Sequence, residues 1–170
     1  MATFNHYQLI LDELKGTLSH VKDEEFDGFA SEVTEASRIF VAGKGRSGFV
    51  ANSFAMRLNQ LGKQAFVIGE STTPSIQKGD LFIVISGSGS TEHLQVVLLT
   101  TKLDSAIGEI ADTVVELPAG TKHDATGSDQ PLGSLFEQSS QIFLDSVVIG
   151  LMTQLDVDET TMQNNHANLE

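Results

Sequence analysis

Short apolar runs recur along this chain, separated by polar and glycine-rich stretches. The clearest run is residues 81–85, five consecutive large apolar side chains typical of a parallel strand that is buried on both faces. Similar runs predict a strand that begins at Arg38 and leads into a glycine loop, a strand over residues 65–70 and a final strand over residues 113–117. Strands are therefore expected at intervals through the whole chain.

Between these strands the apolar residues recur every three or four positions, which predicts amphipathic helices. Such helices are expected to begin at Asp23, to span residues 50–61 and 105–112, and to begin again at Pro131 and Asp158. The opening helix has one narrow apolar stripe, formed by Phe4, Tyr7, Leu11, Leu14, Leu18 and Val21. Such a stripe is typical of a seam between helices, so we expect it to dock on the rest of the domain or on another subunit.

Residues 91–101 allow two interpretations. The stretch from Val96 to Thr101 has the composition of a strand, but only residues 92–95 separate it from Thr91. A crossover between parallel strands needs about ten to twelve residues or more, including its helix. Either residues 91–101 form a single helix, or they contain a strand and the connection before it is incomplete relative to a working domain.

Strands that alternate with helices predict one α/β domain over residues 1–170, with an N-terminal helix and a C-terminal helical tail. In such a domain a parallel sheet has helices on both faces, and ligands bind at the carboxyl ends of the strands. Two glycine loops lie at such ends, residues 43–48 and residues 86–91. We therefore expect both loops to converge on one site.

The two loops have the composition of a phosphate-binding site. Glycines let the backbone approach a ligand closely, and the start of a helix attracts anions. The second loop adds hydroxyl groups that can donate to phosphate oxygens, those of Ser86, Ser88, Ser90 and Thr91. The alternative is a solvated serine–glycine turn. The second loop is not a Walker loop, and the first has GxGxxG spacing without a well-placed acidic residue for a ribose.

Charge and composition limit the kinds of molecule that the chain is expected to bind. The formal net charge of −13 opposes binding to nucleic acid or to an anionic membrane. There is no apolar run of about 18 residues and no signal-peptide pattern, so we expect a cytoplasmic protein. With no cysteine and five scattered histidines, no metal site is predicted. The expected partners are small molecules and further copies of the chain, with Lys44 and Arg46 as local cations for an anion.

Several segments together resemble the sugar isomerase (SIS) domain family, and within it the 6-phospho-3-hexuloisomerases. The resemblance spans nearly the whole chain and depends on residues 43–48, 54–58, 69–74, 86–89, 130–137 and 166–170. The serine loop marks only the broad family, whereas the last two segments indicate the narrower group. The resemblance implies a three-layer αβα sandwich with a flavodoxin-like five-stranded parallel sheet, assembled as a homotetramer.

The resemblance also implies a reaction, the interconversion of 3-hexulose 6-phosphate and fructose 6-phosphate in the ribulose monophosphate route of formaldehyde assimilation. Moving a carbonyl between C3 and C2 of a phosphorylated hexulose needs a base, an acid and a phosphate anchor, but no metal or cofactor. The chain departs from the family at Asn59-Gln60, where a methionine–histidine pair is frequent. It also lacks about a dozen residues after the serine loop, enough for a crossover helix.

Glu137 is the candidate base, because a partly desolvated carboxylate has a raised pKa and can move a proton between neighbouring carbons. The alternative is a first-turn glutamate that interacts only with the helix dipole. His166 is the candidate acid or ring-opening group, or else a surface or capping residue. The phosphate and the sugar hydroxyls are assigned to Arg46, Ser47, Ser86, Gly87, Ser88, Gly89, Ser90 and Thr91. Arg46 can instead serve in a structural ion pair.

Three functional classes follow from these features. The first is an isomerase, with another phosphosugar aldose–ketose isomerase as its variant. The second is a non-catalytic sugar-phosphate-binding module, although such modules usually accompany a DNA-binding domain, for which we expect no room here. The third is a flavin or nucleotide binder, which the missing ribose carboxylate and the lack of tryptophan disfavour. Fold alone does not separate these classes.

Overall fold

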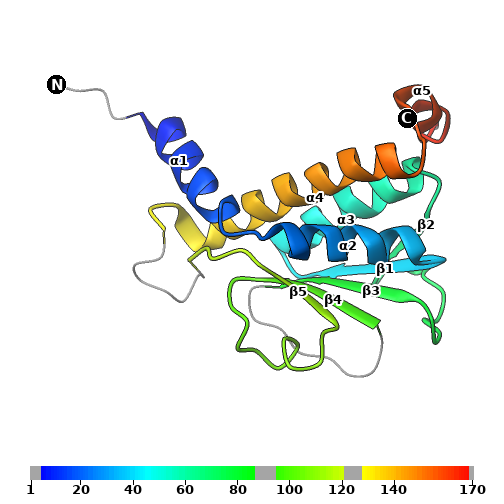
Figure 1. Cartoon of the computed structure of the whole chain (residues 1–170), viewed down its shortest axis with the longest axis horizontal. Helices are drawn as coiled ribbons and strands as arrows, with labels where there is room; N and C mark the ends of the chain where they lie inside the picture. The colour runs from blue at the N-terminus through cyan, green and yellow to red at the C-terminus, as the bar shows by residue number, and fades with distance from the viewer. Residues whose placement is uncertain (1–4, 87–94, 121–127, 169–170) are drawn as a thin grey trace.

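Figure 1 shows the computed structural model of the chain, which describes residues 5–86, 95–120 and 128–168. The strands are β1 (Arg38–Gly43), β2 (Gln64–Val67), β3 (Leu81–Ile85), β4 (Gln95–Thr100) and β5 (Thr113–Glu116). The helices are α1 (His6–Leu18), α2 (Asp23–Glu35), α3 (Arg46–Gln60), α4 (Ser134–Gln154) and α5 (Glu159–Asn164), with a short 3₁₀ helix, η1 (Pro131–Gly133), before α4.

The strands form one parallel sheet in the order β2-β1-β3-β4-β5. Val41 of β1 pairs with Val67 on one side and with Ile83 on the other. Ile83 in turn pairs with Val97 of β4. The strand interpretation of residues 96–101 is therefore confirmed, and the alternative of a single helix over residues 91–101 is wrong. The predicted α/β class with a five-stranded parallel sheet is confirmed as well.

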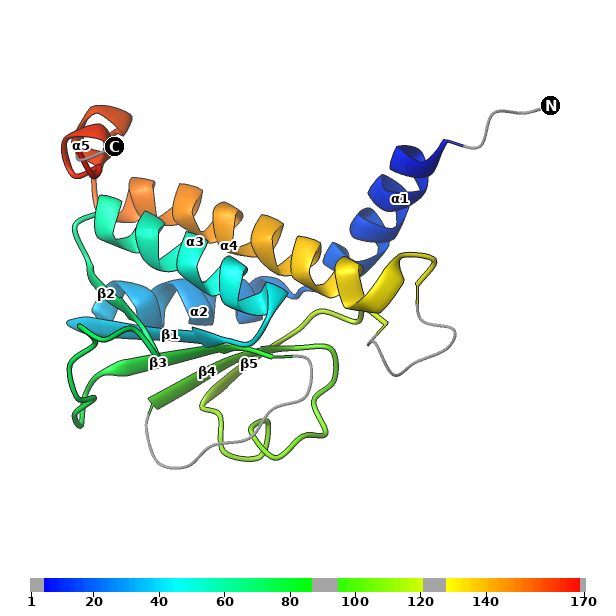
Figure 2. The same cartoon turned by 180° about the vertical axis from the view of Figure 1, so that it is seen from behind.

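The larger core lies between one face of the sheet and the helices. Alternate residues of a strand face opposite sides, and strand residues such as Ile39, Ile83 and Leu99 pack into this core. α2 contacts β5, α3 contacts β1 and β2, and α4 packs against α1, α2 and α3. Figures 1 and 2 show these helices on the same side of the sheet. Burial of their apolar stripes positions α3 and α4 on the sheet. The first turns of both helices belong to the candidate site.

The second face of the sheet has a smaller apolar cluster, formed by Val84, Val96, Leu98 and Ile107. Ile107 belongs to residues 101–112, which form turns, so the helix predicted over residues 105–112 is wrong. A Cβ atom at Gly108 would lie 2.2 Å from the Leu103 carbonyl oxygen, and this close return of the backbone replaces a regular helix. Within the described residues, helices cover one face only, which corrects our expectation of helices on both faces.

α1 extends beyond the body of the domain (Figures 1 and 2). Leu14 and Thr17, near its C-terminal end, are buried, whereas Tyr7 and Leu11 are 68% and 55% exposed. The helix ends at Leu18, so the predicted stripe reaches past it at one end, and Phe4 lies outside the described residues. Half of the stripe docks on its own domain, and the other half faces outward. In the described ranges no helix has the length and apolar character that a bilayer crossing requires.

The turn between β1 and α3 depends on the close approach of two backbone segments. A Cβ atom at Gly43 would lie 2.4 Å from the Ser47 carbonyl oxygen and 2.6 Å from its carbonyl carbon. Backbone atoms cannot move aside as a flexible side chain can. Gly43 therefore lets the first turn of α3, with Arg46 and Ser47, lie directly against the end of β1.

Replacing Gly43 with alanine tests this close approach. We expect Gly43→Ala to lower the free energy of unfolding by about 1–3 kcal/mol, the usual cost of overpacking. Gly28→Ala is the matched control, because no atom lies within 4 Å of a Cβ at this position in α2. An alanine there should stabilise the helix by about 0.5–1 kcal/mol. Urea denaturation measures both changes, and a Gly43→Ala protein as stable as the unmodified chain would contradict the proposed packing.

Candidate active site

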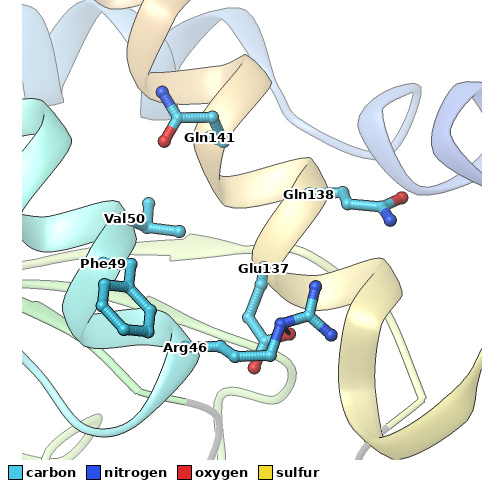
Figure 3. A pocket seen from close by; sticks show the side chains of 6 residues that line it. All are labelled: Arg46, Phe49, Val50, Glu137, Gln138 and Gln141. Atoms are coloured by element: carbon cyan, nitrogen blue, oxygen red, sulfur yellow. Dashed lines mark ion pairs between the residues drawn. The ribbon is translucent and has the colours of Figure 1, made fainter.

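A pocket of ≈ 230 Å³ lies between the first turns of α3 and the first turns of α4. Figure 3 shows its six lining residues, Arg46, Phe49, Val50, Glu137, Gln138 and Gln141. Three of them belong to each helix. The pocket therefore depends on the packing of α3 against α4, which brings together residues about ninety positions apart in the sequence.

Glu137 supplies the carboxylate of the pocket. Its side chain is 15% exposed, and its Oε2 lies 3.2 Å from Nε of Arg46 (Figure 3). That oxygen is buried and accepts no hydrogen bond from any described residue. Burial raises the pKa of Glu137, and the charge of Arg46 opposes the rise without cancelling it. A carboxylate in this state is a better proton acceptor than a solvated one.

Arg46 connects the two helix starts. Its Nη1 donates to Oγ of Ser134, 2.5 Å away, while its Nε faces Glu137. Ser134 in turn donates to the Pro131 carbonyl oxygen at 2.7 Å. The guanidinium thus bridges the start of α3 and the start of α4. The ion-pair alternative for Arg46 is present in the structure, and because its side chain is 52% exposed, a role toward an anion stays a prediction.

Two other predicted binding residues, Ser47 and Ser86, lie at the same edge of the sheet. Ser47 occupies the first turn of α3, and Ser86 follows β3 directly and donates its N–H to the Leu99 carbonyl oxygen at 3.1 Å. Gly43 pairs with Ile85 across β1 and β3, so both loops leave the sheet at one end. Gly87, Ser88, Gly89, Ser90 and Thr91 lie outside the described residues.

His166 lies far from Glu137 within one chain. Asn165, beside it, donates to the Gln60 carbonyl oxygen at 3.0 Å, at the C-terminal end of α3, whereas Arg46 begins that helix. A helix of this length separates its ends by roughly 20 Å. The ring of His166 is exposed, with Nδ1 2.9 Å from the Ala167 carbonyl oxygen. A single chain therefore brings Arg46, Ser47 and Glu137 together, but not His166.

The departure at Asn59-Gln60 has a structural explanation. Asn59 accepts from the backbone N–H of Ala65 at 3.1 Å and donates to its carbonyl oxygen at 2.9 Å. Gln60 is 4% exposed and accepts from Arg57 at 2.9 Å. Asn59 connects the end of α3 with the start of β2, and the Gln60 side chain bonds within the last turn of α3. They do not line the pocket of their own chain.

Sequence reasoning missed Phe49, Gln138 and Gln141 as pocket residues. Helical spacing from Glu137 places Gln141 one turn further on the same face, and this signal was available in the sequence. Gln141 donates to Oγ of Ser53 at 3.3 Å and to Asp145 at 3.0 Å. Phe49 is 74% exposed beside Glu137. Its place in the pocket depends on tertiary packing, which no local pattern indicates.

The sheet, the glycine turn after β1 and the partly desolvated carboxylate define an α/β protein with a candidate acid–base site at the carboxyl edge of its strands. In the described ranges, no three histidine or acidic side chains gather in a way that could hold a metal ion. A family model for the SIS domain matches residues 32–132. The chain belongs to the SIS domain family.

Similar proteins cover nearly the same length. A protein of Bacillus subtilis named 3-hexulose-6-phosphate isomerase is 40% identical, and the alignment covers all of both chains. A protein of the same name from Methylomonas aminofaciens is also 40% identical, over 98% of this chain and 99% of its own. A Methanococcus jannaschii protein whose crystal structure infers a 3-hexulose-6-phosphate isomerase function superimposes with a TM-score of 0.84, at 30% identity over 98% of this chain and 100% of its own.

The Bacillus subtilis alignment spans 185 residues, 15 more than the 170 of this chain. Because that alignment covers both chains completely, the difference lies inside the alignment. A crossover helix with its turns has about this length. The difference agrees with our prediction that the connection before β4 is short relative to the family, and the location of the absent residues stays a prediction.

Replacing Arg46 tests the electrostatic part of the site. The charge of Arg46 lowers the pKa of Glu137, so Arg46→Gln should raise that pKa further. The titration of Glu137, followed by NMR of ¹³C-labelled carboxyl groups, should then shift to higher pH. Arg57→Gln is the control, because Arg57 lies in the last turn of α3. A Glu137 titration that is equal in both variants would contradict the proposed interaction.

Proposed function

We propose that this chain interconverts 3-hexulose 6-phosphate and fructose 6-phosphate through an enediol, the reaction for which its Bacillus subtilis and Methylomonas aminofaciens relatives are named. The proposal includes a cytoplasmic role in the ribulose monophosphate route of formaldehyde assimilation. The observation that carries it is the Glu137 carboxylate, which lines the pocket with a raised pKa and an oxygen that accepts no hydrogen bond within the described chain.

One carboxylate is sufficient for both proton transfers at carbon, the removal from C2 and the return to C3. Glu137 takes the proton from C2 of the 3-ketose, the C2–H electron pair forms the C2–C3 double bond of the enediol, and a general acid gives a proton to O3. The conjugate base of that acid then takes the proton of the C2 hydroxyl as the new carbonyl forms, and Glu137 returns its own proton to C3. The product is the 2-ketose, fructose 6-phosphate. No external oxidant or reductant is needed, because the carbonyl only changes its position.

The phosphate must be held at a distance from the reacting carbons. We assign it to the loop edge, where Ser47 and Ser86 lie at the ends of β1 and β3, together with the first turn of α3. Arg46 adds local positive charge at this edge in a chain whose net charge is −13. The carbon chain of the substrate then extends toward α4 and Glu137.

His166 and the outward half of α1 lead us to propose a homotetramer. His166 is remote from the pocket of its own chain, so its role as ring-opening group or acid requires the pocket of another copy. Tyr7 and Leu11 expose an apolar seam that a neighbouring subunit can cover. Each active site would then combine Glu137 of one subunit with His166 of another.

A non-catalytic sugar-phosphate-binding module is the second candidate, and one observation favours it. The chain has 15 residues fewer than its alignment with the Bacillus subtilis relative. A loss beside the serine loop can remove turnover and leave phosphate binding intact. Tight binding of fructose 6-phosphate without isomerisation, measured on one preparation, would identify this case.

The variant Glu137→Gln tests the base directly. It keeps the shape and hydrogen-bonding capacity of the side chain but removes its proton affinity, so kcat should fall by about 10²-fold or more. The affinity for fructose 6-phosphate should survive, because the phosphate anchor is untouched. A coupled assay for fructose 6-phosphate formation and calorimetry measure the two quantities.

Glu35→Gln is the matched control, an exposed carboxylate on α2 whose loss should leave kcat unchanged. His166→Asn should cost less than Glu137→Gln if the histidine only assists ring opening. Unchanged turnover in Glu137→Gln would exclude Glu137 as the base. Turnover and affinity that are lost together would make it a binding residue.

The proposed assembly predicts a particle of four 18.3 kDa chains. Light scattering at micromolar concentration should give that mass. The double variant Tyr7→Glu, Leu11→Glu should give a smaller particle, because two charges at the seam oppose its burial. The control Asp12→Asn changes an exposed residue of the same helix and should keep the full mass. A monomeric unmodified chain would contradict the assembly.

A further inference from the structure

A carboxylate on α1 binds the segment that leads to the candidate base. Glu13 Oε1 accepts from the backbone N–H of Asp129 at 2.8 Å. Its Oε2 accepts from Oγ of Ser128 at 3.0 Å and from Nε2 of Gln130 at 2.9 Å. Three donors from three consecutive residues thus converge on one side chain that is more than one hundred positions away in the sequence.

The bound segment continues directly into the active-site helix. Ser128 Oγ also accepts from the backbone N–H of Gln130 at 3.0 Å, so Ser128 and Gln130 are bonded to each other as well as to Glu13. Gln130 is 9% exposed and immediately precedes η1. The Ser134 N–H donates to the Pro131 carbonyl oxygen, and Arg46 holds the Ser134 hydroxyl. Glu137 follows within the same first turn of α4.

The hydrogen bonds to Glu13 favour its ionised form. Burial acts to raise its pKa, but the hydrogen bonds from Asp129, Gln130 and Ser128 outweigh burial and lower the pKa. Hydrogen bonds to a charged acceptor are about twice as strong as neutral ones. Because the pKa of Glu13 is lowered and that of Glu137 is raised, Glu13 is ionised wherever Glu137 is, and it accepts from all three donors.

We propose that Glu13 is a positioning residue, which fixes residues 128–130 and thereby the orientation of Glu137 at the start of α4. Glu13 itself lies outside the pocket and does not act on the substrate. The inference rests on the proposed function for its catalytic consequence. Its structural part, the immobilisation of the chain before α4, is measurable without any substrate.

The variant Glu13→Gln tests the inference with little change in size. The amide oxygen keeps the bond from Asp129, whereas the amide nitrogen meets two donor groups, Ser128 Oγ and Gln130 Nε2. We expect the backbone amides of Gln130 and Ser134 to exchange hydrogen about tenfold faster. kcat should fall about tenfold, with KM within about twofold, because a small displacement of the base affects the transition state more than binding.

Two further variants separate positioning from general stability. Asp12→Asn, an exposed neighbour on α1 bonded to Gln8 at 3.0 Å, should leave exchange and kcat unchanged. In the Glu137→Gln background, Glu13→Gln should cause no further loss of kcat, because both changes then act on one group.

The outcomes of these experiments distinguish a failure of the inference about Glu13 from a failure of the proposed function. Normal exchange at Gln130 and Ser134 in Glu13→Gln would overturn the inference, and so would an equal loss of kcat in the Glu137→Gln background. If the unmodified chain does not isomerise the sugar, the proposed function fails, and hydrogen exchange alone still decides whether Glu13 holds this segment.

Discussion

The contact between the starts of α3 and α4 is the interaction on which the site depends. Arg46 donates to Ser134 and lies 3.2 Å from Glu137, so one guanidinium fixes two helices that are adjacent in space and distant in sequence. This contact is possible because Gly43 lets α3 begin directly against β1. It also keeps the Glu137 carboxylate partly desolvated. Burial at this contact raises the pKa of Glu137, and the charge of Arg46 limits the rise.

The first turns of α4 contain buried polar groups that lower the stability of the fold. In the described part of the chain, the Gln138 Oε1 and the hydroxyls of Ser139 and Ser140 are buried without a hydrogen-bond partner. Each such group typically costs about 1–3 kcal/mol. The remainder of α4 offsets this cost with apolar residues such as Phe143, Leu144 and Val147 in the main core. Conflict between local rules and the fold is expected at functional sites.

Much of the fold was predictable, because local patterns determine it. Apolar runs identified four of the five strands, whereas residues 96–101 were compatible with a strand or with part of a helix over residues 91–101. Residue spacing alone indicated that the connection between β3 and β4 is too short for a crossover helix. Residues 105–112 were mispredicted because Gly108 permits a close backbone return that periodicity does not reveal. Glu137 was found from its motif. Phe49 and the Glu13 network were not, because their contacts exist only after α3, α4 and α1 have packed together, whereas helical spacing from Glu137 could have indicated Gln141.

The position of proton exchange on the sugar tests the central claim most directly. Fructose 6-phosphate incubated with the unmodified chain in D₂O should lose its C3 proton signal in the NMR spectrum, because the 2,3-enediol exchanges that proton through Glu137. Loss at C3 that disappears in Glu137→Gln would agree with the account. Exchange at C1 would indicate an aldose–ketose isomerase instead. A bound sugar with neither C3 exchange nor formation of the 3-ketose would contradict the account.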